Sequence, residues 1–226
     1  VKFADYEQLT PAETDRIKKA FVSSPEYVEG IFAKRGAKEW AESVSGLSAL
    51  LAAMTEAKID PSTAVIKRLE SGKPVFTNIP YYFNISHSCG RAVCVLSDVE
   101  VGADIEFIKK VRAFDLIAEN FFAPEEIKRF RSAKNSAEEF YRIWTRKEAL
   151  LKKEGCGIEY KKLKNTDTFV YPDAEFIEYK RGQYLTTVCL GKKVNNLYKQ
   201  TKKAVKRLLL QVKNVIINRL RSYIPQ

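Results

Sequence analysis

One short pattern limits the fold of this chain more than any other. Residues 102–106 read GADIE, with apolar Val101 before them and Phe107 after them. In a β-strand successive side chains point to opposite faces, so Asp104 and Glu106 share one face while the apolar residues take the other. The pattern therefore predicts a strand with one buried side and with two neighbouring carboxylates on its other side.

A second pattern has a helical spacing. Residues 144–152 read WTRKEALLK, which places Trp144, Glu148 and Lys152 at steps of four. On a helix these side chains form one stripe. If the helix packs on the strand that carries the two acids, three carboxylates and a lysine converge. Oxygen ligands in that number suit Mg²⁺, and a nearby lysine suits a phosphate.

Each pattern also has an ordinary structural explanation. Asp104 and Glu106 can be acids on a solvated strand face, and Glu148 with Lys152 can be an i,i+4 ion pair worth about 0.2–0.5 kcal/mol. Two carboxylates this close repel each other unless a cation lies between them. The context therefore favours a cation partner, either a lysine or Mg²⁺.

Composition indicates a globular chain of 226 residues, 45% of them hydrophobic, with room for one large domain or two small ones. No apolar run approaches the roughly 20 residues of a membrane span. The cysteines, at positions 89, 94, 156 and 189, form no Cys-x-x-Cys pair, so we expect reduced thiols in a cytoplasmic protein. Their spacing disfavours a zinc site that would include His87.

The net charge of +11 is unevenly distributed. Residues 192–226 hold ten Lys or Arg and no Asp or Glu, whereas the rest of the chain holds 29 basic and 28 acidic side chains. An apolar stripe in this tail predicts a long amphipathic basic helix. Such an asymmetry indicates an acidic partner. Nucleic acid is not expected, because no recognition motif accompanies the charge.

Turn and capping residues divide the chain into short elements. Helices are predicted at residues 11–22, 38–57, 111–121, 124–132 and 136–154. Strands are predicted at 63–69, 81–86, 91–97, 101–107, 169–178 and 184–190, with turns at 71–74 and 88–90. Ser136 and Glu139 match a capping box. Helices followed by strands, twice over, predict an α+β protein in two halves that meet near residues 98–102.

His87 is the only histidine, and it lies in the run NISHS at residues 84–88. A lone histidine is more often structural than catalytic. At a strand end among small hydroxyl residues it also suits contact with an anion. The chain has no Walker A loop and no G-x-G-x-x-G motif, so the common nucleotide-binding folds are not supported.

The order of the short motifs is more specific than any one of them. They are GKP at 72–74, FNISHS at 83–88, GADIE at 102–106, FF at 121–122 and WTRKEALLKKEG at 144–155. From about residue 10 to residue 190 this order resembles the Sfp-type 4′-phosphopantetheinyl transferases. The resemblance implies an α+β fold of two similar halves related by a pseudo-twofold axis, with coenzyme A between them. The implied reaction moves 4′-phosphopantetheine to a serine of an acyl or peptidyl carrier protein and releases 3′,5′-ADP.

The resemblance also implies a metal site and catalytic residues. Asp104, Glu106 and Glu148 look like the ligands of Mg²⁺, with Mn²⁺ as an alternative. Lys152 resembles the lysine that meets the α-phosphate and protonates the leaving oxygen. Glu126 resembles a carboxylate that helps to deprotonate the carrier serine, a role for which Glu148 is the alternative.

Further residues correspond to contacts with coenzyme A. Ser86 and His87 look like phosphate contacts, Lys73 lies near the adenosine end, and Lys147 is assigned to cofactor binding with Lys152. The family usually has an arginine for the 3′-phosphate in the helix predicted here at 38–57, and this helix has none. The basic residues that could replace it are Lys34, Arg35 and Lys38.

We therefore expect an N-terminal half at 1–100, a C-terminal half at 101–190 and a basic helical extension at 191–226. The expected partner is an acidic acyl or peptidyl carrier protein, and the enzyme is expected to be a monomer. For the extension, packing on the body is favoured over carrier capture and over contact with an anionic membrane. Two rival functions remain: an inactive relative that binds acidic proteins or membranes, and a Mg²⁺-dependent phosphohydrolase. They differ from a transferase in that neither loads a carrier with the pantetheine arm.

Overall fold

The computed structural model describes residues 1–109, 113–155 and 160–192, and Val1–Gly191 form one compact unit. The first half of this unit contains β1 (Lys2–Asp5), α1 (Pro11–Ala20), α2 (Pro25–Phe32), α3 (Ala37–Glu56), β2 (Ile66–Arg68), β3 (Pro74–Phe76), β4 (Tyr82–Ser88) and β5 (Arg91–Ser97). The second half contains β6 (Val101–Phe107), α4 (Phe114–Phe121), α5 (Pro124–Ser132), α6 (Ser136–Glu154), α7 (Tyr160–Asn165), β7 (Ala174–Arg181) and β8 (Tyr184–Gly191).

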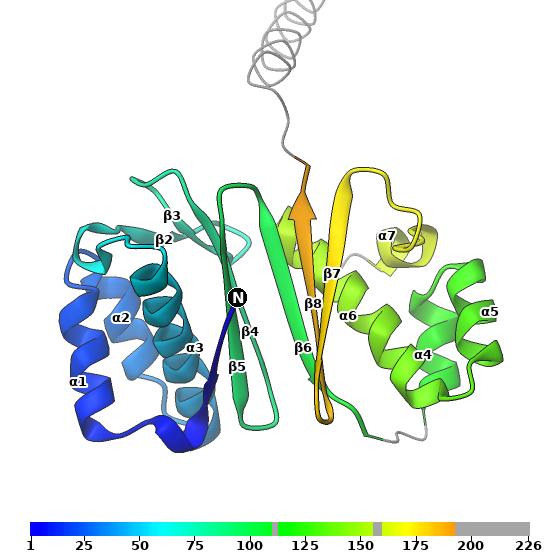
Figure 1. The fold of residues 1–226 in the computed structure, drawn as a ribbon, viewed down its shortest axis with the longest axis horizontal. Helices are drawn as coiled ribbons and strands as arrows, with labels where there is room; N and C mark the ends of the chain where they lie inside the picture. The colour runs from blue at the N-terminus through cyan, green and yellow to red at the C-terminus, as the bar shows by residue number, and fades with distance from the viewer. Residues whose placement is uncertain (110–112, 156–159, 193–226) are drawn as a thin grey trace, which may run out of the picture. The chain divides into compact units, whose positions relative to one another are not determined.

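Each half has a three-stranded antiparallel sheet with helices beside it (Figure 1). The first sheet has the order β1-β5-β4 and packs on α3. The second has the order β6-β8-β7 and packs on α6. Strands β4 and β6 are therefore the facing edges of two sheets, and they lie against each other.

Each half also has its own apolar core. In the first half the helices bury their apolar faces on β4 and β5, with Phe21, Leu50 and Phe83 at most 2% exposed. In the second half an aromatic cluster joins α4, α5 and α6, where Phe114 stacks on Phe140 with ring centroids 4.2 Å apart. Such burial removes apolar surface from water and is the main force that holds the helices on the sheets.

Helix α6 lies unusually close to strand β6, because Gly102 leaves room for its backbone. A Cβ atom at Gly102 would lie 2.0 Å from the carbonyl oxygen of Ala149 and 2.3 Å from the amide nitrogen of Lys153. At its other end α6 stops at Gly155, which adopts φ 70° in the left-handed region that glycine tolerates best. The close approach brings the helical stripe to the strand with the two acids.

Most predicted elements are present, and the α+β class is confirmed. The cap of α6 is a correction: the side chain of Asn135, not Ser136, accepts the hydrogen bond, from the Glu138 amide. The predicted strand at 63–69 is confined to Ile66–Arg68, and that at 169–178 begins only at Ala174. The prediction missed the short elements β1, α2, β3 and α7 and the two 3₁₀ helices at Tyr6–Gln8 and Pro61–Thr63.

The internal twofold relation and the three-part division stay predictions. The predicted basic helix lies outside the described residues. Within the described residues, no helix combines the length and apolar character that crossing a membrane requires.

Candidate functional site

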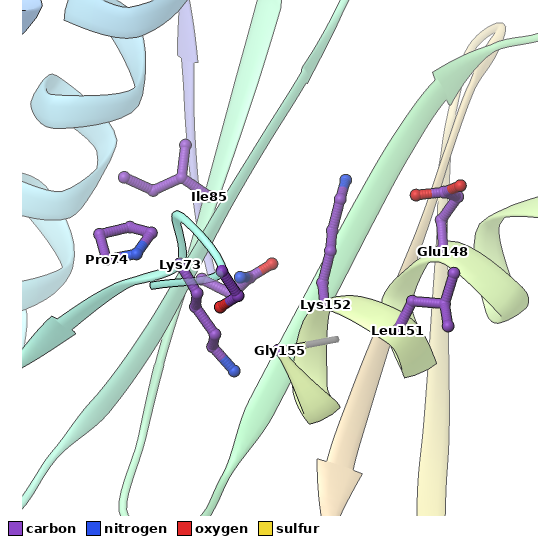
Figure 2. A pocket seen from close by; sticks show the side chains of 9 residues that line it. Lys73, Pro74, Ile85, Glu148, Leu151, Lys152 and Gly155 are labelled. Atoms are coloured by element: carbon purple, nitrogen blue, oxygen red, sulfur yellow. The ribbon is translucent and has the colours of Figure 1, made fainter. Parts of the chain in front are cut away.

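A pocket of about 250 Å³ opens where the two halves meet (Figure 2). The turn before β3 contributes Lys73, strand β4 contributes Ile85, and helix α6 contributes Glu148 and Lys152. Because Gly155 ends α6 in the same wall, the helix terminus, the turn and the strand edge all border one space. The pocket therefore combines residues of the GKP, FNISHS and WTRKEALLKKEG motifs, whereas Asp104 and Glu106 are not among its lining residues.

Asp104 and Lys152 form an ion pair beside this pocket. The Lys152 ammonium lies 2.5 Å from Asp104 Oδ1 and 3.0 Å from the hydroxyl oxygen of Ser86, which itself donates to Asp104 Oδ1 at 2.9 Å. Asp104 is 4% exposed, so the pair is shielded from water on the carboxylate side. The predicted meeting of the strand acid with the helical lysine is thus present.

The other two acids carry signs of crowding. Burial, and then the Asp104 carboxylate, raises the pKa of Glu106 to about 7, although a hydrogen bond from Ser88 and the charge of Lys152 act against this. Burial and the Asp104 carboxylate also raise the pKa of Glu148 above its ordinary value. Both shifts have the same two causes, partial burial of the carboxyl group and repulsion from the Asp104 carboxylate.

The fit of these residues to a divalent cation can be tested on the structure itself. No three His, Cys, Asp or Glu side chains of the described residues are gathered as a ready metal site. However, Asp104 Oδ2 is buried and, among the described residues, has no hydrogen-bond partner. An unpaired buried carboxylate oxygen beside two crowded carboxylates is a donor set that suits a hard cation. These side chains are of the kind that Mg²⁺ takes as ligands, although they are not gathered as a ready site, and the three-carboxylate assignment stays a prediction.

Lys73 is held at the junction of the halves. Its ammonium donates to the carbonyl oxygen of Lys153 at 2.7 Å and lies 3.5 Å from that of Val101. Its stem lines the pocket, and its Cδ lies 3.2 Å from where a Cβ at Gly155 would be. The side chain thus links the turn of the first half to the end of α6 and the start of β6.

His87 lies on the other face of β4, toward helix α3. Its Nδ1 is 3.4 Å from Glu42 Oε2, and burial lowers its pKa while the Glu42 charge opposes that shift. Lys38 also lies 3.7 Å from Glu42, and Lys34 donates to the Ser43 hydroxyl at 2.6 Å. Lys34 and Lys38, two of the three residues that could replace the missing arginine, therefore lie near His87: Lys38 contacts Glu42, and Lys34 contacts the adjacent Ser43.

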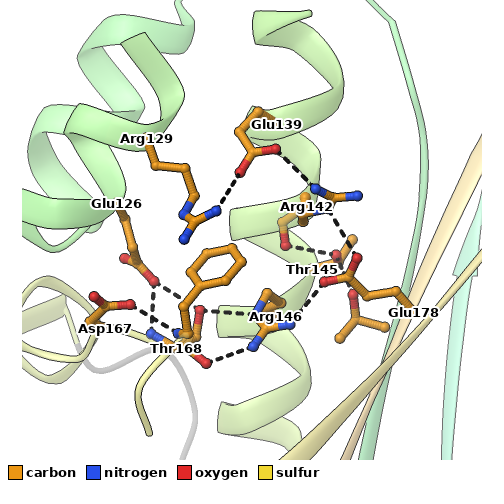
Figure 3. A network of polar contacts seen from close by, with 11 residues as sticks. Glu126, Arg129, Glu139, Arg142, Thr145, Arg146, Asp167, Thr168 and Glu178 are labelled. Atoms are coloured by element: carbon orange, nitrogen blue, oxygen red, sulfur yellow. Dashed lines mark hydrogen bonds and ion pairs between the residues drawn. The ribbon is translucent and has the colours of Figure 1, made fainter. Parts of the chain in front are cut away.

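The structure places Glu126 in a buried network of polar groups (Figure 3) and pairs it with buried Lys147, and neither residue lines the pocket. Their charged groups are 2.6 Å apart, and the two side chains are 0% and 1% exposed. Glu126 also accepts hydrogen bonds from the amide and hydroxyl of Thr168 and from the Ala123 amide. Lys147 donates to two carbonyl oxygens, those of Leu163 and Thr166.

This network changes how two predicted roles are understood. Burial lowers the pKa of Lys147, whereas the Glu126 charge opposes the shift. In the structure neither side chain lines the pocket, so neither the predicted contact of Lys147 with a cofactor nor the predicted action of Glu126 on a serine has a contact to support it. Their neighbours indicate that the pair instead joins α5 and α6 to the segment after α7.

The sequence reasoning missed two residues of β4. Asn84 lines the pocket, and Ser88 donates to Glu106 Oε2 at 3.0 Å. The signal was available, because polar Asn84, Ser86 and Ser88 alternate with Phe83, Ile85 and His87. Period-two alternation in a strand places these polar groups on one face.

The sequence of the chain is similar to those of known proteins. The family model described as the 4′-phosphopantetheinyl transferase superfamily matches residues 100–212. A Haemophilus influenzae protein provisionally named a 4′-phosphopantetheinyl transferase is 41% identical over 120 residues, which are 50% of this chain and 49% of that protein. The 4′-phosphopantetheinyl transferase psf-1 of Bacillus pumilus is 43% identical over 94 residues, 40% of this chain and 39% of psf-1.

A third relative is the 4′-phosphopantetheinyl transferase Sfp of Bacillus subtilis. It is 34% identical over 105 residues, which are 45% of this chain and 46% of Sfp. The chain thus spans about half the length, or less, of the curated relatives it matches.

Proposed function

We propose that this chain, which belongs to the 4′-phosphopantetheinyl transferase superfamily, moves the 4′-phosphopantetheine group of coenzyme A to a serine of an acyl or peptidyl carrier protein. The observation that carries this proposal is the pocket between the halves, where Lys152 pairs with Asp104 and where Glu148 lines the same wall. The relatives psf-1 and Sfp are both named 4′-phosphopantetheinyl transferases, which supports the proposal.

The reaction joins the serine Oγ to the phosphorus that bears the pantetheine arm and breaks the P–O bond to 3′,5′-ADP. The serine proton must leave as the new bond forms. Glu148 is our candidate to accept it, because its carboxylate lines the pocket. Lys152 is our candidate to stabilise or protonate the leaving oxygen, since its ammonium points into the same site.

Asp104, Glu106 and Glu148 are the residues that would hold Mg²⁺ or Mn²⁺. Bound there, such a cation would neutralise the charge of the pyrophosphate and orient it. For coenzyme A itself we propose Lys73, Ser86 and His87 as contacts, as the motif resemblance implies. In the structure Ser86 already donates to Asp104, so its hydroxyl serves the acid in the absence of substrate.

We also propose an acidic carrier protein as partner, a monomeric enzyme and a cytoplasmic location. Cys89, Cys94 and Cys189 are free thiols, which supports a reducing compartment. The role of residues 192–226 in packing, carrier capture or membrane contact is tested by their deletion. An increased Michaelis constant for the carrier would indicate capture, and lower stability with an unchanged constant would indicate packing.

One assay tests the proposed function against its rivals. The protein is mixed with coenzyme A, Mg²⁺ and an apo carrier protein, and the carrier is weighed by mass spectrometry. A gain equal to the pantetheine arm is expected. Loss of coenzyme A without carrier present would indicate a phosphohydrolase, and no reaction with any carrier would indicate a binding module.

Glu148→Ala provides the internal control for this assay. It should abolish transfer while coenzyme A binding, measured by calorimetry, stays largely intact. An acid–base group typically contributes at least about 10²-fold to the rate. If the variant retains more than about a tenth of the wild-type turnover, its loss is smaller than that contribution, and the assigned role of Glu148 is wrong.

A further inference from the structure

Strands β4 and β6 meet through side chains, although both are edges of sheets. In the described part of the chain they belong to separate sheets and share no backbone ladder. An edge strand exposes a row of unpaired N–H groups, and burying them without partners would be costly. On β6 the N–H groups of Ala103, Ile105 and Phe107 are hydrogen-bonded to side chains of β4 instead of to a strand backbone.

Polar side chains of β4 take up these three N–H groups in order. The Ala103 amide donates to Asn84 Oδ1 at 2.8 Å. The Ile105 amide donates to Ser86 Oγ at 3.3 Å, and the Phe107 amide donates to Ser88 Oγ at 3.2 Å. We call the three side chains Asn84, Ser86 and Ser88 the polar junction. The polar junction sets the register between the two strands, because residues 84, 86 and 88 of β4 bind residues 103, 105 and 107 of β6 in the same order.

The two serines of the polar junction have a second contact, and it follows the same pattern. Ser86 Oγ donates to Asp104 Oδ1 at 2.9 Å, and Ser88 Oγ donates to Glu106 Oε2 at 3.0 Å. A hydroxyl has one proton to donate. Because each hydroxyl oxygen accepts a backbone N–H, its own proton is free to be directed at the acid beside that N–H. Each serine of β4 thus bridges a carboxylate of β6 and a backbone N–H group of β6.

We propose that Ser88 is a positioning residue that holds Glu106 ready to bind the divalent cation, an inference that rests on the proposed function. Without the hydroxyl, repulsion from Asp104 would favour rotamers of the flexible Glu106 side chain that carry its carboxylate away. Partners that orient metal ligands typically change metal affinity by about 10–100-fold when removed. Ser88 lies outside residues 100–212, so the half that the family model does not match would prepare the acids of the half that it does.

The test compares three variants with the wild type. Ser88→Ala removes both hydrogen bonds of the hydroxyl. Ser88→Thr keeps a hydroxyl at a half-buried position. Ser97→Ala is the matched control: Ser97 lies on β5, and its hydroxyl also accepts one backbone N–H, that of Val99 at 3.1 Å. Both alanine variants lose such a bond, whereas Ser88→Ala also loses the contact with Glu106.

Mg²⁺ affinity is measured without coenzyme A, from the rise in melting temperature with Mg²⁺ concentration, and the half-activating Mg²⁺ concentration is measured in the transfer assay. We expect Ser88→Ala to need about tenfold more Mg²⁺ in both measurements, and Ser88→Thr and Ser97→Ala to stay within about threefold of wild type. A simple loss of stability would lower the melting temperature of both alanine variants without changing Mg²⁺ affinity.

Two results would overturn the positioning role while leaving the transferase proposal intact. One is a Ser88→Ala variant that titrates with Mg²⁺ like the wild type, and the other is a Ser88→Thr variant as weak as Ser88→Ala. A wild type that transfers the arm but shows no Mg²⁺-dependent shift would also overturn it. Failure of the wild type to load any carrier is a separate result, and it would refute the proposed function itself.

Discussion

The Lys152 ammonium lies 2.5 Å from Asp104 Oδ1, so in the structure a side chain of the protein balances the charge of the most buried of the three acids. The lysine is 31% exposed at its side chain, whereas the aspartate is 5% exposed. A cation bound by Asp104 would share this carboxylate with Lys152 and compete with it for the same negative charge. The pair therefore links the charge of the lysine to the affinity of the acids for a metal.

Lys152→Met tests this link. Transfer should fall by at least about 100-fold, because the charge on the leaving oxygen is no longer stabilised. Mg²⁺ affinity, measured by thermal shift without coenzyme A, should stay the same or rise, because the competing ammonium is gone. Lys67→Met, at an exposed position on β2, serves as control and should change neither quantity. Weaker Mg²⁺ binding in Lys152→Met would contradict the competition.

Glu106→Gln should stabilise the protein at high pH. The pKa of Glu106 is about 7 in the folded protein against an ordinary value of 4.5, so between these values the folded state holds a proton that the unfolded state lacks. Stability from this group is therefore present at low pH and is lost as the pH rises toward 7. At pH 8 and without Mg²⁺ the variant should melt roughly 2–4 °C higher, the shift that about 1 kcal/mol produces in a domain of this size.

The same variant should melt with the wild type near pH 4.5, where the wild-type carboxyl is already protonated in the folded state. Glu175→Gln, at an exposed position on β7, is the control and should show no pH-dependent difference. An equal gain for Glu106→Gln at both pH values would mean that its charge is not the cause.

Glu126→Gln separates a structural role from a catalytic one. Removing one partner of a buried ion pair leaves an uncompensated charge and typically costs about 3–5 kcal/mol. We therefore expect a large drop in melting temperature, with a similar drop for Lys147→Met and a smaller combined effect in the double variant than the sum. Glu125→Gln, whose pair with Lys128 is exposed, should be nearly neutral. A Glu126→Gln protein of normal stability but without turnover would restore Glu126 as the base.

Gly102→Ala should prevent the close packing of α6 on β6. The added methyl group would lie 2.0 Å from the Ala149 carbonyl oxygen, a contact that forces backbone to move. We expect a protein that is largely insoluble, or one that melts more than about 10 °C lower, since overpacking of this kind costs several kcal/mol. Gly30→Ala, in α2 with nothing within 4 Å of the new Cβ, should be neutral or slightly stabilising. Normal melting of Gly102→Ala would show that the helix and the strand lie farther apart.

Local patterns were sufficient to predict much of the fold. The strand at Val101–Phe107, the hairpin of β4 and β5, and the helix at Ser136–Glu154 follow from side-chain periods and turn residues within one segment. The short elements β1 and β3 were missed because they have few residues in which a period can appear. Strand β1 pairs with β5, far along the chain, and it is this pairing that makes it a strand.

By itself the sequence determined which residues can share a face: Asp104 with Glu106, and Glu148 with Lys152, because the repeat of a strand or a helix is a local property. Only the tertiary structure decided which faces are buried and what they meet. Glu148 borders the pocket, whereas its neighbour Lys147 turns into a buried pair with Glu126. Successive helical residues point about 100° apart, and the packing of distant segments alone selects which of them reaches the site.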